Sequence, residues 1–263
     1  MIAVASTAAG FRAIARDVDR ALDRVAERPE VKRETAYYLA NISKVRSIDD
    51  LMADRRLLAF ALEAHGLADM AYAKGLVRRA LVEGVDNNRS LANRLVDPRW
   101  RDFVTTFNFA RNGAATTSFT RAKAGTVERY ERQALEEQAG AQNAGVRLAL
   151  YFQRKAPEAT SAIQVLADKA LSEVVRTTLG IPAATAALPL DRQIALLESR
   201  LDFSTFRDSD KLGRFLDRFS ARWDMARAGE AGSAASPFTA AVQGGGLTGD
   251  TLLRLQRLRT GGA

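Results

Sequence analysis

The chain has 263 residues, of which 47% are hydrophobic and 27% charged, with 18 glycines and only 6 prolines. This composition is typical of a globular protein holding one large or two small domains, and unlike that of a disordered or collagenous chain. With no cysteine, the sequence excludes disulfides, thiolate nucleophiles and cysteine-ligated metals, and its single histidine excludes a metal site with two imidazoles.

The formal net charge of +8 would suit a protein that binds nucleic acid or an anionic surface. However, residues 1–113 hold 19 basic and 15 acidic residues, and residues 114–263 hold 20 and 16. This even spread argues against a dedicated patch. A basic nucleic-acid-binding helical module remains the alternative function, with local candidates at Arg78, Arg79, Arg254, Arg257 and Arg259.

The first eleven residues lack the basic and long apolar regions of a secretory signal peptide, so we expect none. The uncharged stretch from Thr177 to Leu190 is too short to span a bilayer and contains two prolines, so we expect no membrane span.

Apolar residues recur at helical spacing along most of the chain, and alternation over strand length is hard to find. The pattern predicts helices over residues 11–28, 29–46, 48–65, 67–83, 98–107, 121–155, 158–179, 182–200 and 209–226. Gly140 and Gly145 are candidate weak points of the long helix over residues 121–155. Ser47 and Asp97 are expected N-caps, and Gly66 and Gly84 are expected to end helices. The predicted fold is therefore an all-α, multi-helix bundle.

The stretch from Asn112 to Ser118 is the clearest break in the middle of the chain. We therefore expect a helical N-terminal unit over residues 1–113 and a helical C-terminal unit over residues 121–226, packed together as one body. A Gly/Ala/Ser-rich linker is predicted over residues 227–249, followed by a short amphipathic tail over residues 250–263.

Two apolar stripes near the termini are candidate partner-binding surfaces. The first comprises Phe11, Ile14 and Val18, spaced by three and four residues. The second lies in the tail and comprises Leu252, Leu253, Leu255 and Leu258. The alternative for both stripes is packing against the protein's own helical body.

An offset of 114 residues aligns residues 33–67 with residues 147–181 without a gap. The identical pairs are Arg33/Arg147, Tyr37/Tyr151, Ser47/Ser161, Ala53/Ala167, Asp54/Asp168, Leu57/Leu171 and Gly66/Gly180. The alignment predicts two similar helix-hairpin units related by an internal repeat. Helical amphipathicity alone is the competing explanation.

No standard catalytic motif is present: the sequence has no phosphate-binding loop, dinucleotide fingerprint, nucleophile elbow or zinc-protease motif. The acid pairs Asp49–Asp50 and Glu136–Glu137 are expected to be solvated, and His65 is expected in the last turn of a helix. We therefore predict no catalytic residue, cofactor or metal site. An enzyme with a carboxylate-based site is a third alternative.

Several segments between Ser47 and Gly113 resemble a known family: Ser47 to Leu58, Ala64 to Leu67, Ser90 to Leu95 and Asp97 to Trp100. The sequence resembles the alphaproteobacterial DUF1217 family over about residues 35–220. The resemblance implies a helical protein whose genes often accompany flagellar genes, and it supplies no catalytic residues.

Together these observations predict a non-enzymatic structural or assembly protein that is associated with the bacterial flagellum. It would act through contacts with flagellar or other proteins, and its expected location is the cytoplasm or the flagellum.

Overall fold

The computed structural model describes residues 6–234, and within this range the chain forms α-helices, short 3-10 helices and no β-strand. The predicted all-α, multi-helix fold is confirmed. The α-helices are α1 (Thr7–Ala15), α2 (Val18–Ala26), α3 (Pro29–Ile42), α4 (Ile48–Ala53), α5 (Arg55–Ala64), α6 (Lys74–Glu83), α7 (Leu91–Arg94), α8 (Pro98–Thr106), α9 (Phe109–Asn112), α10 (Ala124–Gln142), α11 (Ala144–Lys155), α12 (Ala162–Ala167), α13 (Lys169–Leu179), α14 (Leu190–Glu198) and α15 (Ser209–Ala234). The 3-10 helices are η1 (Ala68–Met70), η2 (Gly113–Ser118), η3 (Thr120–Ala122), η4 (Ala156–Glu158), η5 (Ala183–Ala187) and η6 (Phe203–Arg207). None of these helices is both long and apolar enough to cross a bilayer.

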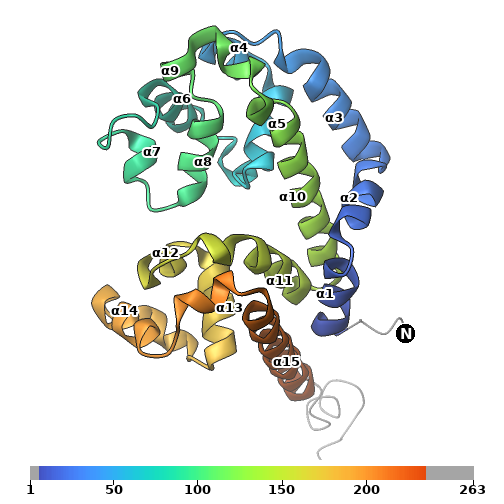
Figure 1. Ribbon diagram of the computed structural model, residues 1–263, viewed down its shortest axis with the longest axis vertical. Helices are drawn as coiled ribbons and strands as arrows, with labels where there is room; N and C mark the ends of the chain where they lie inside the picture. Colours follow the sequence, from blue (N-terminus) through green and yellow to red (C-terminus); the bar gives the residue numbers. More distant parts are fainter. Residues whose placement is uncertain (1–5, 235–263) are drawn as a thin grey trace, which may run out of the picture.

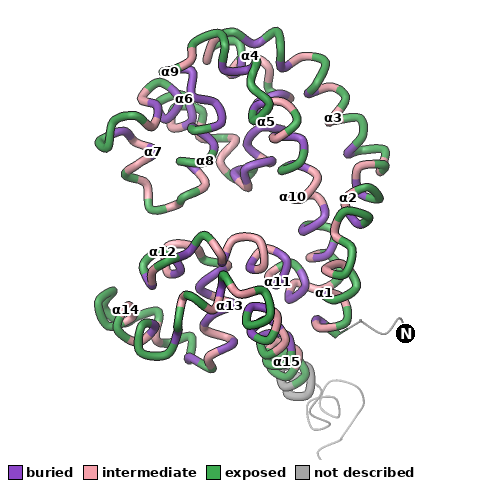
Figure 2. Tube along the Cα trace, in the orientation of Figure 1, coloured by how far each residue is buried: buried purple, intermediate pink, exposed green. Residues whose placement is uncertain are grey.

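The helices form two lobes, and α10 runs from one to the other along one side of the molecule (Figure 1). Each lobe has its own buried core, as the distribution of buried residues along the trace shows (Figure 2). On α10, the residues up to Leu135 belong to the first core, whereas Ala139 belongs to the second. The division between the lobes therefore lies near the end of α10, not at residues 113–121 as predicted, because α10 packs against α2, α3 and α5.

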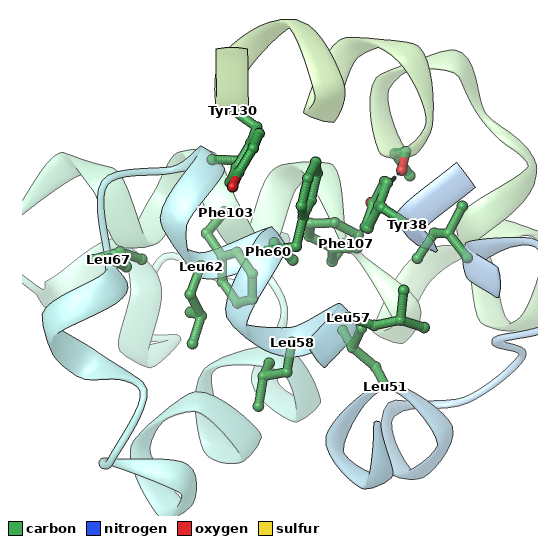
Figure 3. Packing of buried hydrophobic residues seen from close by; sticks show 14 of the residues in the cluster. Tyr38, Leu51, Leu57, Leu58, Phe60, Leu62, Leu67, Phe103, Phe107 and Tyr130 are labelled. Carbon is green, nitrogen blue, oxygen red and sulfur yellow. Dashed lines mark hydrogen bonds between the residues drawn. The ribbon is translucent and has the colours of Figure 1, made fainter. Parts of the chain in front are cut away.

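Stacked aromatic rings fill the centre of the first lobe (Figure 3). The ring of Phe60 lies between Tyr38, at 4.3 Å between centroids, and Tyr130, at 4.0 Å. The hydroxyl of Tyr38 donates a hydrogen bond of 2.5 Å to the carbonyl of Ala122. These contacts join α3, α5 and α10 through buried rings, and the hydroxyl of Tyr38 has a hydrogen-bond partner.

The second lobe is built around Phe152 of α11. Its ring stacks on Phe215 of α15 at 5.4 Å between centroids and meets Phe206 edge-on at 5.1 Å. Phe206 lies in η6, so this cluster holds the segment before α15 against α11. Both lobes therefore have an aromatic centre, assembled from segments far apart in the sequence.

Four predicted helices are each broken by one residue with a short polar side chain. Asp17, Asp54, Asn143 and Asp168 adopt non-helical backbone angles, and each side chain accepts a hydrogen bond from a backbone N–H two or three residues ahead. Such hydrogen bonds are typical of helix N-caps, so each of these four residues begins a new helix in a new direction. The predicted single helices over residues 11–28, 48–65, 121–155 and 158–179 are therefore wrong.

Three predicted helices are shorter in the structure, and one is longer. The helix predicted over residues 29–46 is α3, which ends at Ile42. Residues 67–83 form η1 and then α6, and residues 182–200 form η5 and then α14. The last described helix, α15, continues to Ala234 and so enters the segment predicted as a linker. The rest of that linker, residues 235–249, and the tail, residues 250–263, lie outside the described residues.

Other local predictions are confirmed. Ser47 and Asp50 form a capping box at the start of α4, and Asp97 caps α8 with Pro98 in its first turn. Gly66 follows the end of α5 with φ +71°, a left-handed conformation that favours glycine.

The segments related by the 114-residue offset have matching local structure. Helices α4 and α12 coincide under this offset, and α5 and α13 begin at equivalent residues. In the first lobe Tyr37 donates to Asp54 at 2.8 Å, and in the second Tyr151 donates to Asp168 at 2.6 Å. An internal repeat would produce these similarities, and the repeat itself remains a prediction.

The N-terminal helix α1 is fastened to the second lobe. The backbone N–H and hydroxyl of Thr7 donate to the carboxylate of Asp224 on α15, at 2.6 to 3.2 Å. At the same junction α11 packs closely against α15. A Cβ added to Gly145 of α11 would lie 2.5 Å from Trp223 of α15. Helix α1 is thus wedged between α11 and α15.

Candidate functional site

A cleft of about 1100 Å³ lies between the two lobes. The first lobe lines it with the end of α5 and the start of α8, and the second lobe with α11 and the α12–α13 junction; α10 forms the side that joins them. The charged residues that line the cleft are Asp97, Arg99, Asp102, Glu128, Arg129, Arg132, Arg147, Arg154, Lys155, Glu158, Asp168, Lys169 and Glu173. The cleft is therefore rich in charged side chains of both signs.

A buried ion pair supports the α10–α11 side of the cleft. Arg154 donates two hydrogen bonds to the carboxylate of Glu136, at 2.9 and 3.0 Å. Only 3% of the Glu136 side chain is exposed. Burial raises the pKa of Glu136, and the guanidinium of Arg154 opposes this shift. The pair holds α10 and α11 together through a carboxylate that depends on Arg154 for its counter-charge.

An ion pair crosses the cleft from one lobe to the other. The ammonium of Lys155, at the end of α11, lies 3.2 Å from the carboxylate of Asp102 on α8 and 3.0 Å from that of Glu158. Because Asp102 is half-exposed, this contact is worth little in stability, at most about 1 kcal/mol. It is a direct contact between α8 of the first lobe and α11 of the second.

Arg99 is held in place at the first-lobe edge of the cleft. Its guanidinium forms a two-pronged contact with Asp97, at 3.0 and 2.7 Å, and also donates to the carbonyl of Gly66. Since Asp97 is the N-cap of α8, one carboxylate both starts the helix and fixes the arginine.

On the opposite edge, the hydroxyl of Tyr151 donates to Asp168, which is also the N-cap of α13. Burial, together with the neighbouring carboxylate, raises the pKa of Tyr151, so the phenol stays protonated near neutral pH. Tyr151 is therefore a hydrogen-bond donor with a fixed acceptor and is unsuited to act as a base.

His65 ends α5, as predicted, and it is 7% exposed. Its ring meets Phe103 edge-on at 5.6 Å, and its Nε2 atom has no hydrogen-bond partner. Burial lowers the pKa of His65 to about 3, with Arg129 and Lys155 adding to the shift. The imidazole is thus neutral at physiological pH and packs as an aromatic residue.

This burial predicts a measurable dependence of stability on pH. In the unfolded chain His65 would take up a proton below about pH 6.5, whereas the folded chain resists protonation down to about pH 3. Acid therefore favours the unfolded state, by about 2 kcal/mol between pH 7 and pH 5. Urea unfolding at pH 7 and at pH 5 measures this loss of stability. We expect the His65→Leu variant to lack the part of the loss that comes from His65. If both proteins lost the same free energy of unfolding between pH 7 and pH 5, the effect could not be assigned to His65.

Within the described residues, no group of three or more histidine, aspartate or glutamate side chains is arranged to hold a metal ion. The acid pairs singled out in the sequence behave differently from each other. Asp49 pairs with Arg78 on the surface, whereas Glu136 is buried against Arg154. The expectation that Glu136 is solvated is therefore wrong, because α11 brings an arginine over it.

Comparison with known proteins gives two positive findings. The profile of a family described as "Protein of unknown function (DUF1217)" matches residues 64–212. This chain belongs to the DUF1217 family. The DUF1217 chain is also similar to a protein from Agrobacterium tumefaciens, whose crystal structure was determined by the Northeast Structural Genomics Consortium. The two are 45% identical with a TM-score of 0.78, and the match covers 84% of this chain and 94% of that one. A comparison with curated proteins gives no match.

Of the predicted partner-binding residues of this DUF1217 protein, those within the described range do not line the cleft. Phe11 is only 6% exposed and belongs to the second core, so its prediction as a contact residue is wrong: α1 folds back between α11 and α15 and buries it. Ile14 is partly buried against both cores, and Val18 is half-buried at the start of α2. The tail residues Leu252, Leu253, Leu255 and Leu258 lie outside the described residues.

The sequence analysis did not predict that Arg129, Arg132 and Arg147 of the DUF1217 chain line one cleft. Arg129, Arg132 and Arg147 are separated by other charges, so no basic cluster stands out. A helical projection would have placed Arg129 and Arg132 on one side of α10, since residues three apart share a helix face. Which lobe they face depends on contacts that the local pattern does not specify.

Proposed function

We propose that this DUF1217 protein is a non-enzymatic structural or assembly protein of the bacterial flagellum that acts through protein–protein contacts. The observation that supports contact with another protein is the open cleft between the lobes. Ligand pockets for small molecules are mostly apolar and measure about 300 to 1000 Å³. A cleft of about 1100 Å³ lined by many charged side chains suits a polypeptide segment better.

The flagellar part of the proposal rests on the family, whose genes often accompany flagellar genes. We expect deletion of the gene to reduce swimming and the number of flagella per cell, counted by electron microscopy, and a plasmid copy to restore both. Normal flagellation and swimming in the deletion strain would contradict this part of the proposal.

Affinity capture would locate the contact on the chain. The full-length protein and a shortened chain ending at Ala234, which keeps all described helices, would each be recovered from their own cells with bound proteins identified by mass spectrometry. Flagellar components held by both would place the contact on the helical body, and components held only by the full chain would place it in residues 235–263. Recovery of ribosomal or nucleoid proteins that depends on nucleic acid would favour the alternative function.

A further inference from the structure

Three arginines on the α10–α11 side of the cleft have no carboxylate partner within the described part of the chain. Arg129 donates only to the carbonyl of Gly125, at 2.9 Å, and Arg132 and Arg147 form no ion pair. By contrast, Arg99, Arg154 and Lys155, which line the same cleft, each have a carboxylate within 3.2 Å. The three unpaired guanidiniums are therefore free to pair with acidic groups of a ligand.

Two of these arginines, Arg132 and Arg147, lie near a carboxylate that already has a partner. Arg132 and Arg147 both act electrostatically on buried Glu136, but its two oxygens accept from Arg154. The stem of Arg147 also lies tightly across α10, where a Cβ added to Gly140 would lie 2.8 Å from its Cδ. This packing fixes the stem of Arg147 at this corner of the cleft.

The carboxylates of the cleft decide which kind of acidic ligand suits it. Glu128 lies four residues before Arg132 on α10, and Glu173 lies four residues after Lys169 on α13. None of these four residues forms an ion pair within the described range. A nucleic acid presents a phosphate at every step and would meet these carboxylates as well as the arginines. A protein segment can place carboxylates at the arginines and basic side chains at the glutamates.

We propose that the cleft between the lobes binds an acid-rich segment of mixed charge from a partner protein, with Arg129, Arg132 and Arg147 pairing with its carboxylates. The bidentate donors of arginine match the geometry of a carboxylate, as they do that of a phosphate. This inference deepens the proposed function and rests on it, since it names the surface and the chemistry of the protein contact.

The test uses the full chain and a fluorescently labelled twelve-residue peptide with glutamate at every third position. We expect fluorescence anisotropy to show binding that weakens as salt is raised. The charge-reversal variant Arg129→Glu/Arg147→Glu should bind at least about tenfold more weakly, because a close charge pair at an interface contributes about 1.5 kcal/mol or more. Circular dichroism would verify that the variant remains folded.

The matched control is Arg192→Glu/Arg200→Glu, which makes the same change in net charge at two exposed arginines of the α14 region, outside the cleft. Retained binding by this control supports the cleft as the site. Absence of binding by the unchanged protein, or an equal loss in both variants, would overturn the proposal. Tighter binding of duplex DNA than of the peptide, lost in the cleft variant, would overturn it in favour of nucleic acid.

Failure of this inference and failure of the proposed function give different results. Defective swimming in the deletion strain, with no peptide binding, would leave the flagellar role and place its contact elsewhere. Normal swimming, with peptide binding that depends on Arg129 and Arg147, would leave the cleft as a binding site for proteins of another system.

Discussion

Replacing Arg154 with methionine is expected to lower the free energy of unfolding by about 3–5 kcal/mol at pH 7. The substitution removes the guanidinium that pairs with both oxygens of Glu136, whose side chain is 3% exposed, and so leaves a buried carboxylate with only the more distant charges of Arg132 and Arg147. The effect should appear as a lower midpoint in urea unfolding. Because the unpaired carboxylate would protonate more readily when folded, the loss should shrink as the pH is lowered.

Two comparisons make this prediction specific. Arg12→Met removes an exposed ion pair with Asp217 and should cost less than about 1 kcal/mol. The double variant Arg154→Met/Glu136→Gln removes the buried charge with its partner and should recover much of the lost stability. A single Arg154→Met variant as stable as Arg12→Met would show that Glu136 does not require Arg154.

Replacing Phe152 with alanine should also lower the free energy of unfolding by about 3–5 kcal/mol. The ring is fully buried between Phe206 and Phe215, and its removal leaves a cavity at the centre of the second lobe. Phe203, at the edge of the same cluster, is only partly buried, so Phe203→Ala should cost clearly less. Urea unfolding followed by circular dichroism measures both, and equal losses would contradict this account of the core.

The equivalent position in the first lobe is Tyr38, 114 residues earlier, which stacks on Phe60 and bonds to Ala122. We expect Tyr38→Ala to have an effect of similar size. Since α10 contributes to both cores, each variant should shift one shared unfolding transition. Two separate transitions, one sensitive to Tyr38 and the other to Phe152, would show that the lobes unfold independently.

Several local features of this protein could be predicted because they depend on neighbouring residues alone. Ser47 and Asp50 cap one helix, and Asp97 with Pro98 starts another, through bonds that span three residues or fewer. The four missed breaks have the same local chemistry. They were missed because the apolar period continues across Asp54 and Asp168 and outweighs a single capping side chain.

By itself, the sequence determined the class of secondary structure, several capped helix ends and membership of the DUF1217 family, because periodicity, caps and motifs are local properties. Only the tertiary structure decided that α1 packs on the second lobe, that α10 is shared by both cores and that Arg154 neutralises Glu136. These outcomes depend on which side chains meet after helices far apart in the sequence pack together. The cleft and its unpaired arginines follow from that packing.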